Sequence, residues 1–167
     1  MTLSKHPTIV LLFLWILVLS LQAQQNNDDE TLRVFIFAGQ SNMVGSDSKV
    51  KDIKRFPPFE GLGAPQGKVL FSYCIGRQNK MRSNGWVALE HVNNVVGPEL
   101  SFARKVTQHI KAPIAIIKCA AGGTHLGGDW NPDEPIGFKM YPLTLDLIKS
   151  SLADLDKRGI KYRIEGF

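Results

Sequence analysis

The stretch Leu32-Arg-Val-Phe-Ile-Phe-Ala-Gly39 runs directly into Gln40-Ser41-Asn42-Met43. A short and almost wholly apolar run is typical of a parallel strand that is buried on both faces. Small polar residues follow it, so a serine hydroxyl is expected where the strand ends in a turn. A serine nucleophile needs such exposure, together with a base for its proton and N–H donors for the oxyanion. Ser41 is therefore the candidate nucleophile of a hydrolase, and a turn or helix-capping serine is the alternative.

Helix and strand patterns alternate along the rest of the chain. Pro98 suits the first position of a helix, and the apolar residues after it recur at helical spacing. Residues 114–117 predict an inner strand, residues 143–157 the clearest helix, and residues 161–167 the beginning of a third strand. This alternation predicts an α/β fold of the flavodoxin-like, three-layer αβα type with a mainly parallel sheet.

The segment between Ser41 and Pro98 has a less regular pattern. Prolines and glycines interrupt it from Pro57 onward, which is typical of loop structure. Residues 69–73 and 86–89 are short apolar runs, and they predict an excursion of two small strands. Trp86 is expected to pack against its apolar neighbours, with contact to a sugar ring as the alternative.

A second turn with functional potential follows the strand at residues 114–117. It reads Ala120-Ala-Gly-Gly-Thr124, and its adjacent glycines let backbone N–H groups approach a ligand closely. Sites in α/β sheets form at the carboxyl ends of the strands. We therefore expect this turn to lie beside the Ser41 turn, although a tight bend without a ligand is the alternative.

Several motifs accompany the serine turn in a fixed order. They are Gly39-Gln-Ser-Asn-Met-Val-Gly45, Gly97-Pro-Glu-Leu-Ser-Phe-Ala-Arg104, Ile116-Ile-Lys-Cys-Ala-Ala-Gly-Gly-Thr124, Asp129-Trp130 and Tyr162-Arg-Ile-Glu-Gly-Phe167. Together they resemble the sialate O-acetylesterase-like carbohydrate esterases, a branch of the SGNH hydrolases. The resemblance extends from about residue 32 to residue 167 and implies the SGNH form of the αβα fold.

This resemblance implies a reaction and a set of site residues. Ser41 would attack an acetyl ester on a carbohydrate and form an acyl-enzyme, which water then hydrolyses. Gly122 would donate to the oxyanion, with Gly123 as the alternative and the N–H of Ser41 as a second donor. Four neighbouring residues are candidate substrate contacts: Gln40, Asn42, Thr124 and Trp130. No cofactor or metal is implied.

Two blocks of that family have no counterpart among the 167 residues. Neither Gln-Gly-Glu nor Asp-x-x-His occurs, so no residue here inherits the role of general base. The resemblance thus implies a domain that is incomplete at its C-terminus, with negligible esterase activity of this chain alone. His125 is an alternative base, with only Asp129 and Asp133 as distant carboxylates. The competing interpretation is a non-catalytic, truncated or sugar-binding remnant.

The first residues have the pattern of a leader. Lys5 and His6 precede an apolar run over residues 9–21, and Ala23 precedes a polar stretch. This pattern predicts a signal peptide over residues 1–23, a polar linker over 24–31 and one domain over 32–167. The protein is then expected to be secreted or to face the cell envelope, without a stable membrane span after cleavage. An uncleaved signal anchor is the alternative.

Composition excludes some other classes of function. The formal net charge is +5, but basic residues are scattered among acids, so nucleic acid is not an expected partner. The histidines lie apart from one another and from any cysteine, so no metal site is indicated. The two cysteines, Cys74 and Cys119, permit a disulfide in a secreted protein, but their spacing does not decide whether it forms. The oligomeric state is likewise left open.

Overall fold

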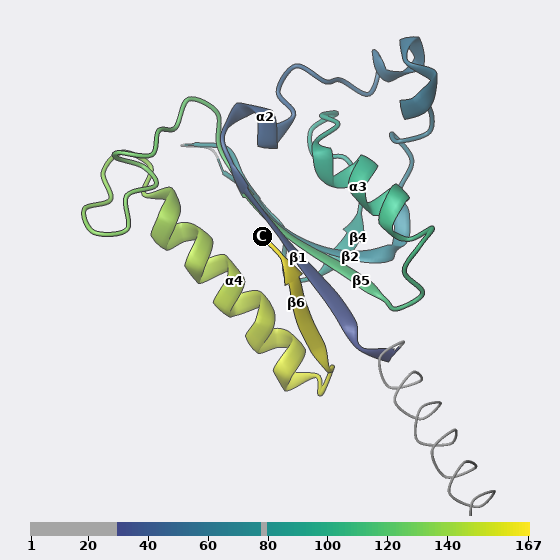
Figure 1. The fold of residues 1–167 in the computed structure, drawn as a ribbon. Coiled ribbons are helices and arrows are strands. Elements are labelled where there is room, and N and C mark those ends of the chain that lie inside the picture. Colours follow the sequence, from purple (N-terminus) through teal and green to yellow (C-terminus); the bar gives the residue numbers. More distant parts are fainter. Residues whose placement is uncertain (1–29, 78–79) are drawn as a thin grey trace, which may run out of the picture.

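The structure, a computed structural model, describes residues 30–77 and 80–167. Within these residues, helices cover both faces of one six-stranded sheet, which gives three αβα layers (Figure 1). This is the flavodoxin-like arrangement of SGNH hydrolases that the sequence predicts. The expected signal peptide lies outside the described residues. No helix in the described part is both long enough and apolar enough to cross a membrane.

Four parallel strands make up most of the sheet. Their order is β2 (Gln66–Ile75), β5 (Ile114–Ala120), β1 (Leu32–Gly39) and β6 (Tyr162–Gly166). Two short strands, β3 (Met81–Arg82) and β4 (Val87–Leu89), pair antiparallel with β2. Strand β5 therefore lies inside the sheet, and all seven of its residues are buried.

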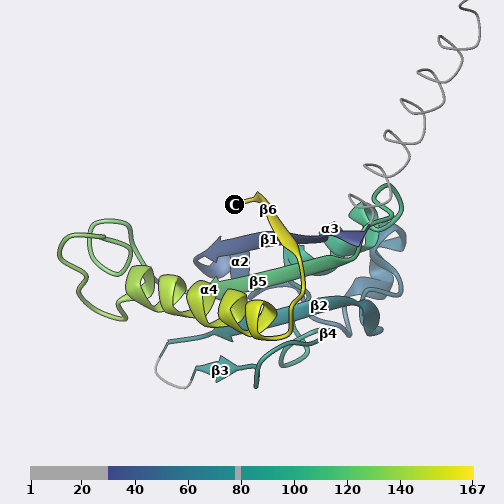
Figure 2. The same ribbon diagram turned by 90° about the horizontal axis from the view of Figure 1, so that it is seen from below.

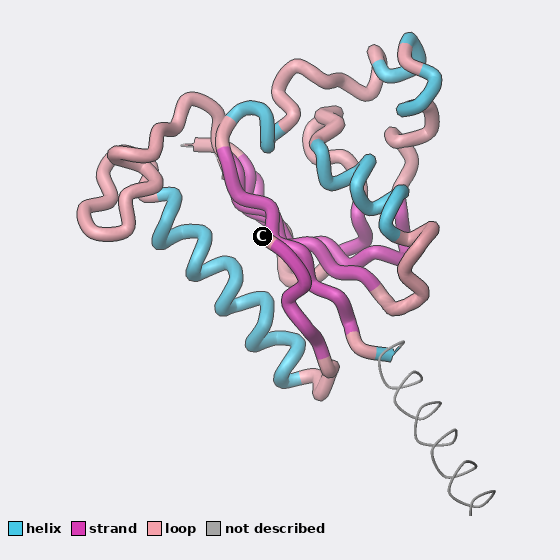
Figure 3. Tube along the Cα trace, viewed as in Figure 1, coloured by secondary structure: helices cyan, strands magenta, loops and turns pink. Residues whose placement is uncertain are grey.

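The helices are divided between the two faces of the sheet, as Figures 2 and 3 show. Helix α4 (Met140–Lys157) covers one face, and helix α3 (Pro98–Val106) covers the other. The four-residue helix α2 (Ser41–Val44) follows β1 directly. Two 3-10 turns, η1 (Ile53–Arg55) and η2 (Pro57–Phe59), lie in the long connection from α2 to β2.

Alternation along the strands supplies a core to each face. In β5, Ala115, Ile117 and Cys119 pack under α4, whereas Ile114 and Ile116 pack on the α3 side. This two-sided burial explains why the inner strands appear in the sequence as nearly continuous apolar runs.

The structure corrects the prediction for residues 69–73. They belong to β2, a ten-residue strand in the middle of the sheet, and not to a small excursion. Ser72 makes the run look only partly apolar, yet it is buried because its hydroxyl hydrogen-bonds to the hydroxyl of Ser151 on α4, at 2.8 Å. Trp86 packs against the same core and donates its indole N–H to Ser151 O at 3.1 Å, as expected for a packing residue.

The other elements agree with prediction except at their ends. Helix α4 begins three residues earlier than expected, at Met140, whose side chain is fully buried beneath the sheet. Pro142 is tolerated there because N–H groups in the first turn of a helix have no partner within the helix. The strand predicted at residues 114–117 continues to Ala120.

Candidate active site

The carboxyl ends of three parallel strands meet at one edge of the sheet. Gly39 of β1 and Ile75 of β2 are both in register with Ala120 of β5. The N–H of Ala121 donates to Gly39 O at 3.1 Å, and the N–H of Gly76 donates to Ala120 O at 2.9 Å. The turns that follow β1 and β5 therefore lie side by side, as the sequence predicts.

Ser41 is the first residue of α2, immediately after the turn. Its hydroxyl donates to Gln40 Oε1 at 2.7 Å, and its N–H donates to the same oxygen at 3.0 Å. At the other end of this helix, Gly45 has a φ of 85°, which a glycine adopts without strain, and its N–H donates to Ser41 O. The hydroxyl and the N–H of Ser41 are the two groups that the predicted reaction needs, and both are hydrogen-bonded to Gln40 Oε1 here.

The two glycines of the second turn face different neighbours. A Cβ atom on Gly122 would lie 3.7 Å from the Cβ of Ser41 and 4.0 Å from the hydroxyl of Ser46. A Cβ atom on Gly123 would instead lie 3.1 Å from Nη1 of Arg77, and Gly123 has a φ of 70°. Gly122 is therefore the glycine that lies against Ser41.

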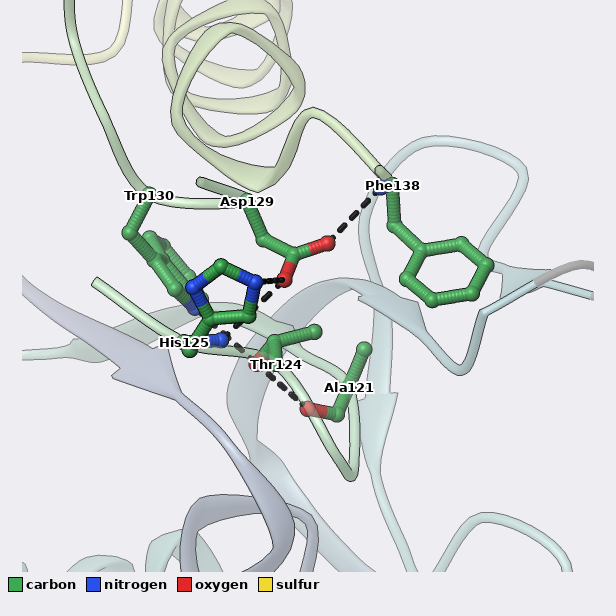
Figure 4. Close-up of polar contacts among 6 residues, drawn as sticks. All are labelled: Ala121, Thr124, His125, Asp129, Trp130 and Phe138. Atoms are coloured by element: carbon green, nitrogen blue, oxygen red, sulfur yellow. Dashed lines mark hydrogen bonds and ion pairs between the residues drawn. The ribbon is translucent and has the colours of Figure 1, made fainter. Parts of the chain in front are cut away.

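Thr124 and Trp130 are engaged in holding the turn (Figure 4). Thr124 Oγ1 donates to Ala121 O at 2.9 Å and accepts the indole N–H of Trp130 at 3.0 Å. With Gln40 they also line a cavity of about 250 Å³. Their polar atoms are therefore committed to the fold, while their outer surfaces border open space.

Asp129 organises the loop that follows. One of its oxygens accepts the N–H of Phe138 at 2.7 Å, and the other accepts the N–H of His125 at 3.1 Å (Figure 4). These bonds, that of Phe138 foremost, hold the pKa of this carboxyl below its usual range. Asp129 is buried, so its carboxylate acts as a structural anchor for the loop.

The expectation that Asp129 is distant from His125 is wrong. His125 Nε2 lies 3.7 Å from Asp129 Oδ2, because the loop folds back on itself between the two residues. The imidazole is 68% exposed, and within the described residues no hydrogen bond joins it to Ser41.

A buried ion pair beneath this edge was not predicted from the sequence. Lys118 of β5 donates from Nζ to Glu99 Oε2 at 2.5 Å and to Val44 O at 3.4 Å. The side chains are 1% and 2% exposed, and burial lowers the pKa of Lys118 while Glu99 opposes that effect. The pair ties β5, α3 and α2 together. The available signal was a lysine inside an apolar strand together with a glutamate in the first turn of a helix.

Open space lies near Ser41 on several sides. Asn42 and Gly45 line a cavity of about 500 Å³, and Gly122 lines a third cavity, of about 220 Å³, together with Lys118 and Glu99. Among residues 30–77 and 80–167, no three His, Cys, Asp or Glu side chains converge in a way that could hold a metal ion. The edge thus combines a serine, a close backbone segment and room for a ligand.

The sequence profile of the family described as "SASA: Carbohydrate esterase, sialic acid-specific acetylesterase" matches residues 31–163. The chain belongs to this family. The match spans both turns of the site, and it assigns the chain broadly to a family of ester hydrolases.

Other comparisons bear on the fold. A solved structure of a protein from Arabidopsis thaliana is similar over 78% of this chain, at 24% sequence identity and a TM-score of 0.50. The present chain spans 53% of that protein's length, about half. No curated protein matches the sequence. The likeness supports the αβα architecture described above.

Proposed function

We propose that this protein is a carbohydrate acetylesterase in which Ser41 is the nucleophile. Ser41 Oγ attacks the carbonyl carbon of an O-acetyl ester on a sugar, and the sugar hydroxyl leaves. Water then attacks the acetyl-serine, releasing acetate and restoring the serine hydroxyl. Membership of the carbohydrate esterase family supports the class of reaction. The position of Ser41 at the carboxyl end of β1 supports the choice of nucleophile.

The observation that carries this proposal is the contact between Ser41 and Gly122. Because Gly122 has no side chain, its backbone can come close to an ester bound at Ser41. A developing oxyanion needs N–H donors aimed at it. Gly122 is our proposed donor, with Gly123 as the alternative. The N–H of Ser41 becomes a second donor once Gln40 Oε1 moves away from it.

The proposed reaction also needs a base for the serine proton. The Gln40 amide, which accepts the hydroxyl here, does not take up a proton at neutral pH. The 167 residues contain no Asp-x-x-His segment. Loss of the base from a serine triad typically costs about 10⁴–10⁶ in turnover, so we expect this chain alone to be nearly inactive.

An added base makes the proposal testable on this chain. Release of acetate from a chromogenic aryl acetate is measured with increasing imidazole, for wild type and for Ser41→Ala. We expect imidazole to accelerate wild type beyond Ser41→Ala, and an acetyl group to be found on the peptide that contains Ser41. The matched control is Ser150→Ala, an exposed serine on α4, which should behave as wild type. Equal rates for wild type and Ser41→Ala would refute Ser41 as the nucleophile.

A second candidate function is sugar binding without turnover. The observation that favours it is the capture of the Ser41 hydroxyl by Gln40, while among residues 30–77 and 80–167 no histidine or carboxylate is hydrogen-bonded to that hydroxyl. Calorimetric titration with an acetylated sugar distinguishes the two. Binding without imidazole-dependent acetyl transfer would favour the binding function, whereas acetyl transfer to Ser41 would exclude it as the sole function.

We further propose that the protein is secreted or faces the cell envelope. Support comes from the leader pattern of residues 1–23 in the sequence. N-terminal sequencing of protein recovered from its producing cells tests this directly. A mature N-terminus near residue 24 is expected, and retention of Met1 would contradict cleavage.

A further inference from the structure

The two cysteines of the chain lie opposite each other in the centre of the sheet. Cys74 of β2 is in parallel register with Cys119 of β5, one residue before each strand ends. Both side chains belong to the cluster under α4, and they are 2% and 1% exposed. Residues far apart in the sequence are thus placed on one face at adjacent positions.

This placement satisfies the main geometric requirement of a disulfide. Neighbouring strands lie about 4.7–4.9 Å apart, and disulfide-bonded cysteines have Cα atoms about 4.4–6.8 Å apart. The two side chains also lie within interaction range, since hydrogen bonding between the thiols shifts the pKa of each. Both cysteines are in the free thiol form in this structure.

The surroundings make the two thiols chemically unequal. The hydrogen bond from Cys119, aided by the charges of Arg82 and Lys80, lowers the pKa of Cys74. The same hydrogen bond and burial raise the pKa of Cys119. Since the thiolate is the attacking form, Cys74 is the first of the pair to react and Cys119 is the resolving thiol.

Both thiols are buried, so a small oxidant reaches the pair only when the fold opens locally. An open cavity of about 440 Å³ lies beside the start of α4 and is lined by Arg77, Lys80, Lys139 and Asp146 among others. Lys80 lines this cavity and its charge lowers the pKa of both thiols, although neither cysteine lines the cavity itself. The excess of cations in its lining attracts an anionic disulfide such as oxidised glutathione.

We propose that Cys74 and Cys119 form a redox-active pair that closes to a disulfide between β2 and β5. The Cys74 thiolate attacks one sulfur of a small-molecule disulfide and expels the first small thiol. Cys119 loses its proton to solvent and attacks the Cys74 sulfur, expelling the second. The protein loses two hydrogen atoms and the small disulfide gains them.

The bond would fasten two strand ends that border the candidate active site. Beyond Cys74, the chain leads to Arg77, whose guanidinium lies against Gly123. Beyond Cys119, it leads to Gly122, which lies against Ser41. Oxidation therefore limits the separation of the Arg77 and Gly122 segments. The proposal concerns the thiols alone and does not depend on esterase activity.

Thiol mapping on the full chain tests the pair. The native protein is equilibrated with either oxidised or reduced glutathione, then denatured and alkylated, and its mass and peptides are analysed. With oxidised glutathione we expect a loss of two hydrogen atoms and a cross-linked peptide containing Cys74 and Cys119. We expect the midpoint of thermal unfolding to rise by about 5–10 °C, reversed by a dithiol.

Single variants assign the order of attack. In Cys119→Ala, Cys74 is expected to hold glutathione as a mixed disulfide, because no resolving thiol remains. In Cys74→Ala, Cys119 is expected to stay reduced. Two alkylated thiols in oxidised wild type, or mixed disulfides without the internal bond, would overturn the proposal. The wild-type mapping gives this answer whether or not the variants fold.

Discussion

Lys118 Nζ lies 2.5 Å from Glu99 Oε2 in the interior, and this ion pair joins β5 to α3 near Gly122. Both residues line the same cavity as Gly122. Lys118 also reaches Val44 O at the end of α2, the helix that begins with Ser41. A single buried cation thus connects three of the elements that position the candidate active site.

Removing one member of this pair should destabilise the fold strongly. Glu99→Gln leaves the Lys118 ammonium buried without its counter-charge, which costs about 3–5 kcal/mol. Urea denaturation of wild type and variant measures the change in free energy of unfolding. The double variant Glu99→Gln with Lys118→Met should recover much of the loss, because no buried charge remains.

The exposed pair Arg158 and Asp154 provides the control for that experiment. Its members are 49% and 45% exposed and 3.4 Å apart. Asp154→Ala should change the free energy of unfolding by less than about 1 kcal/mol. If Glu99→Gln behaved like Asp154→Ala, the interior pair would not stabilise the fold as argued.

The two glycines of the second turn should respond differently to alanine. Gly123→Ala forces a side chain into a left-handed conformation against Arg77, at a cost of about 1–2 kcal/mol. Gly122→Ala meets only an ordinary contact with Ser41, so stability should change little. Its methyl group nevertheless fills space at the nucleophile. Thermal unfolding measures the change in stability of each variant. Imidazole-dependent acetyl transfer measures the effect of each added methyl group on the nucleophile.

Reversed effects would contradict this assignment. A destabilised Gly122→Ala protein with normal acetyl transfer, beside a stable Gly123→Ala protein without it, would make Gly123 the residue that lies against the bound ester.

Acid should loosen the loop anchored by Asp129. The N–H groups of Phe138 and His125 lower the pKa of its carboxyl in the folded protein. The stabilisation is therefore present above the ordinary aspartate pKa of about 3.9 and is lost as pH falls through the lower folded value. Thermal unfolding across this range measures the effect. Asp129→Asn should be less stable at neutral pH and show a flatter acid dependence. If the stability of wild type and of Asp129→Asn fell equally as the pH was lowered, the result would argue against Asp129 as the anchor of this loop.

Strand β6 should make the chain prone to self-association. It borders the sheet, with Ile164 48% exposed and Phe167 86% exposed at its end. Unpaired strand edges with apolar side chains recruit further strands. Sedimentation velocity at rising concentration should detect association, and Ile164→Lys should reduce it.

Phe56→Lys is the matched control, because Phe56 is 54% exposed but lies outside the sheet. Equal reduction by Phe56→Lys and Ile164→Lys would point to general surface hydrophobicity rather than the edge of β6.

Prediction from sequence succeeds where local pattern is decisive. The apolar run of β1 and the helical spacing in α4 each report burial along one element, since side-chain direction repeats with the geometry of that element. The rule that parallel strands end at one edge was enough to bring the Ser41 turn and the Ala120–Thr124 region together. The same reasoning misplaced β2, because Ser72 breaks the apolar pattern and its partner, Ser151, lies on a distant helix.

Pairings between distant residues depended on the order and register of the strands. Gly122 and not Gly123 faces Ser41, Lys118 finds Glu99, and Cys74 lies opposite Cys119. A shift of one residue in the register of β5 would turn Lys118 and Cys119 to the other face of the sheet and move the turn that carries Gly122. Register is set cooperatively by packing on both faces. The residue types needed for the site are therefore readable along the chain, while their contacts exist only once the sheet has assembled.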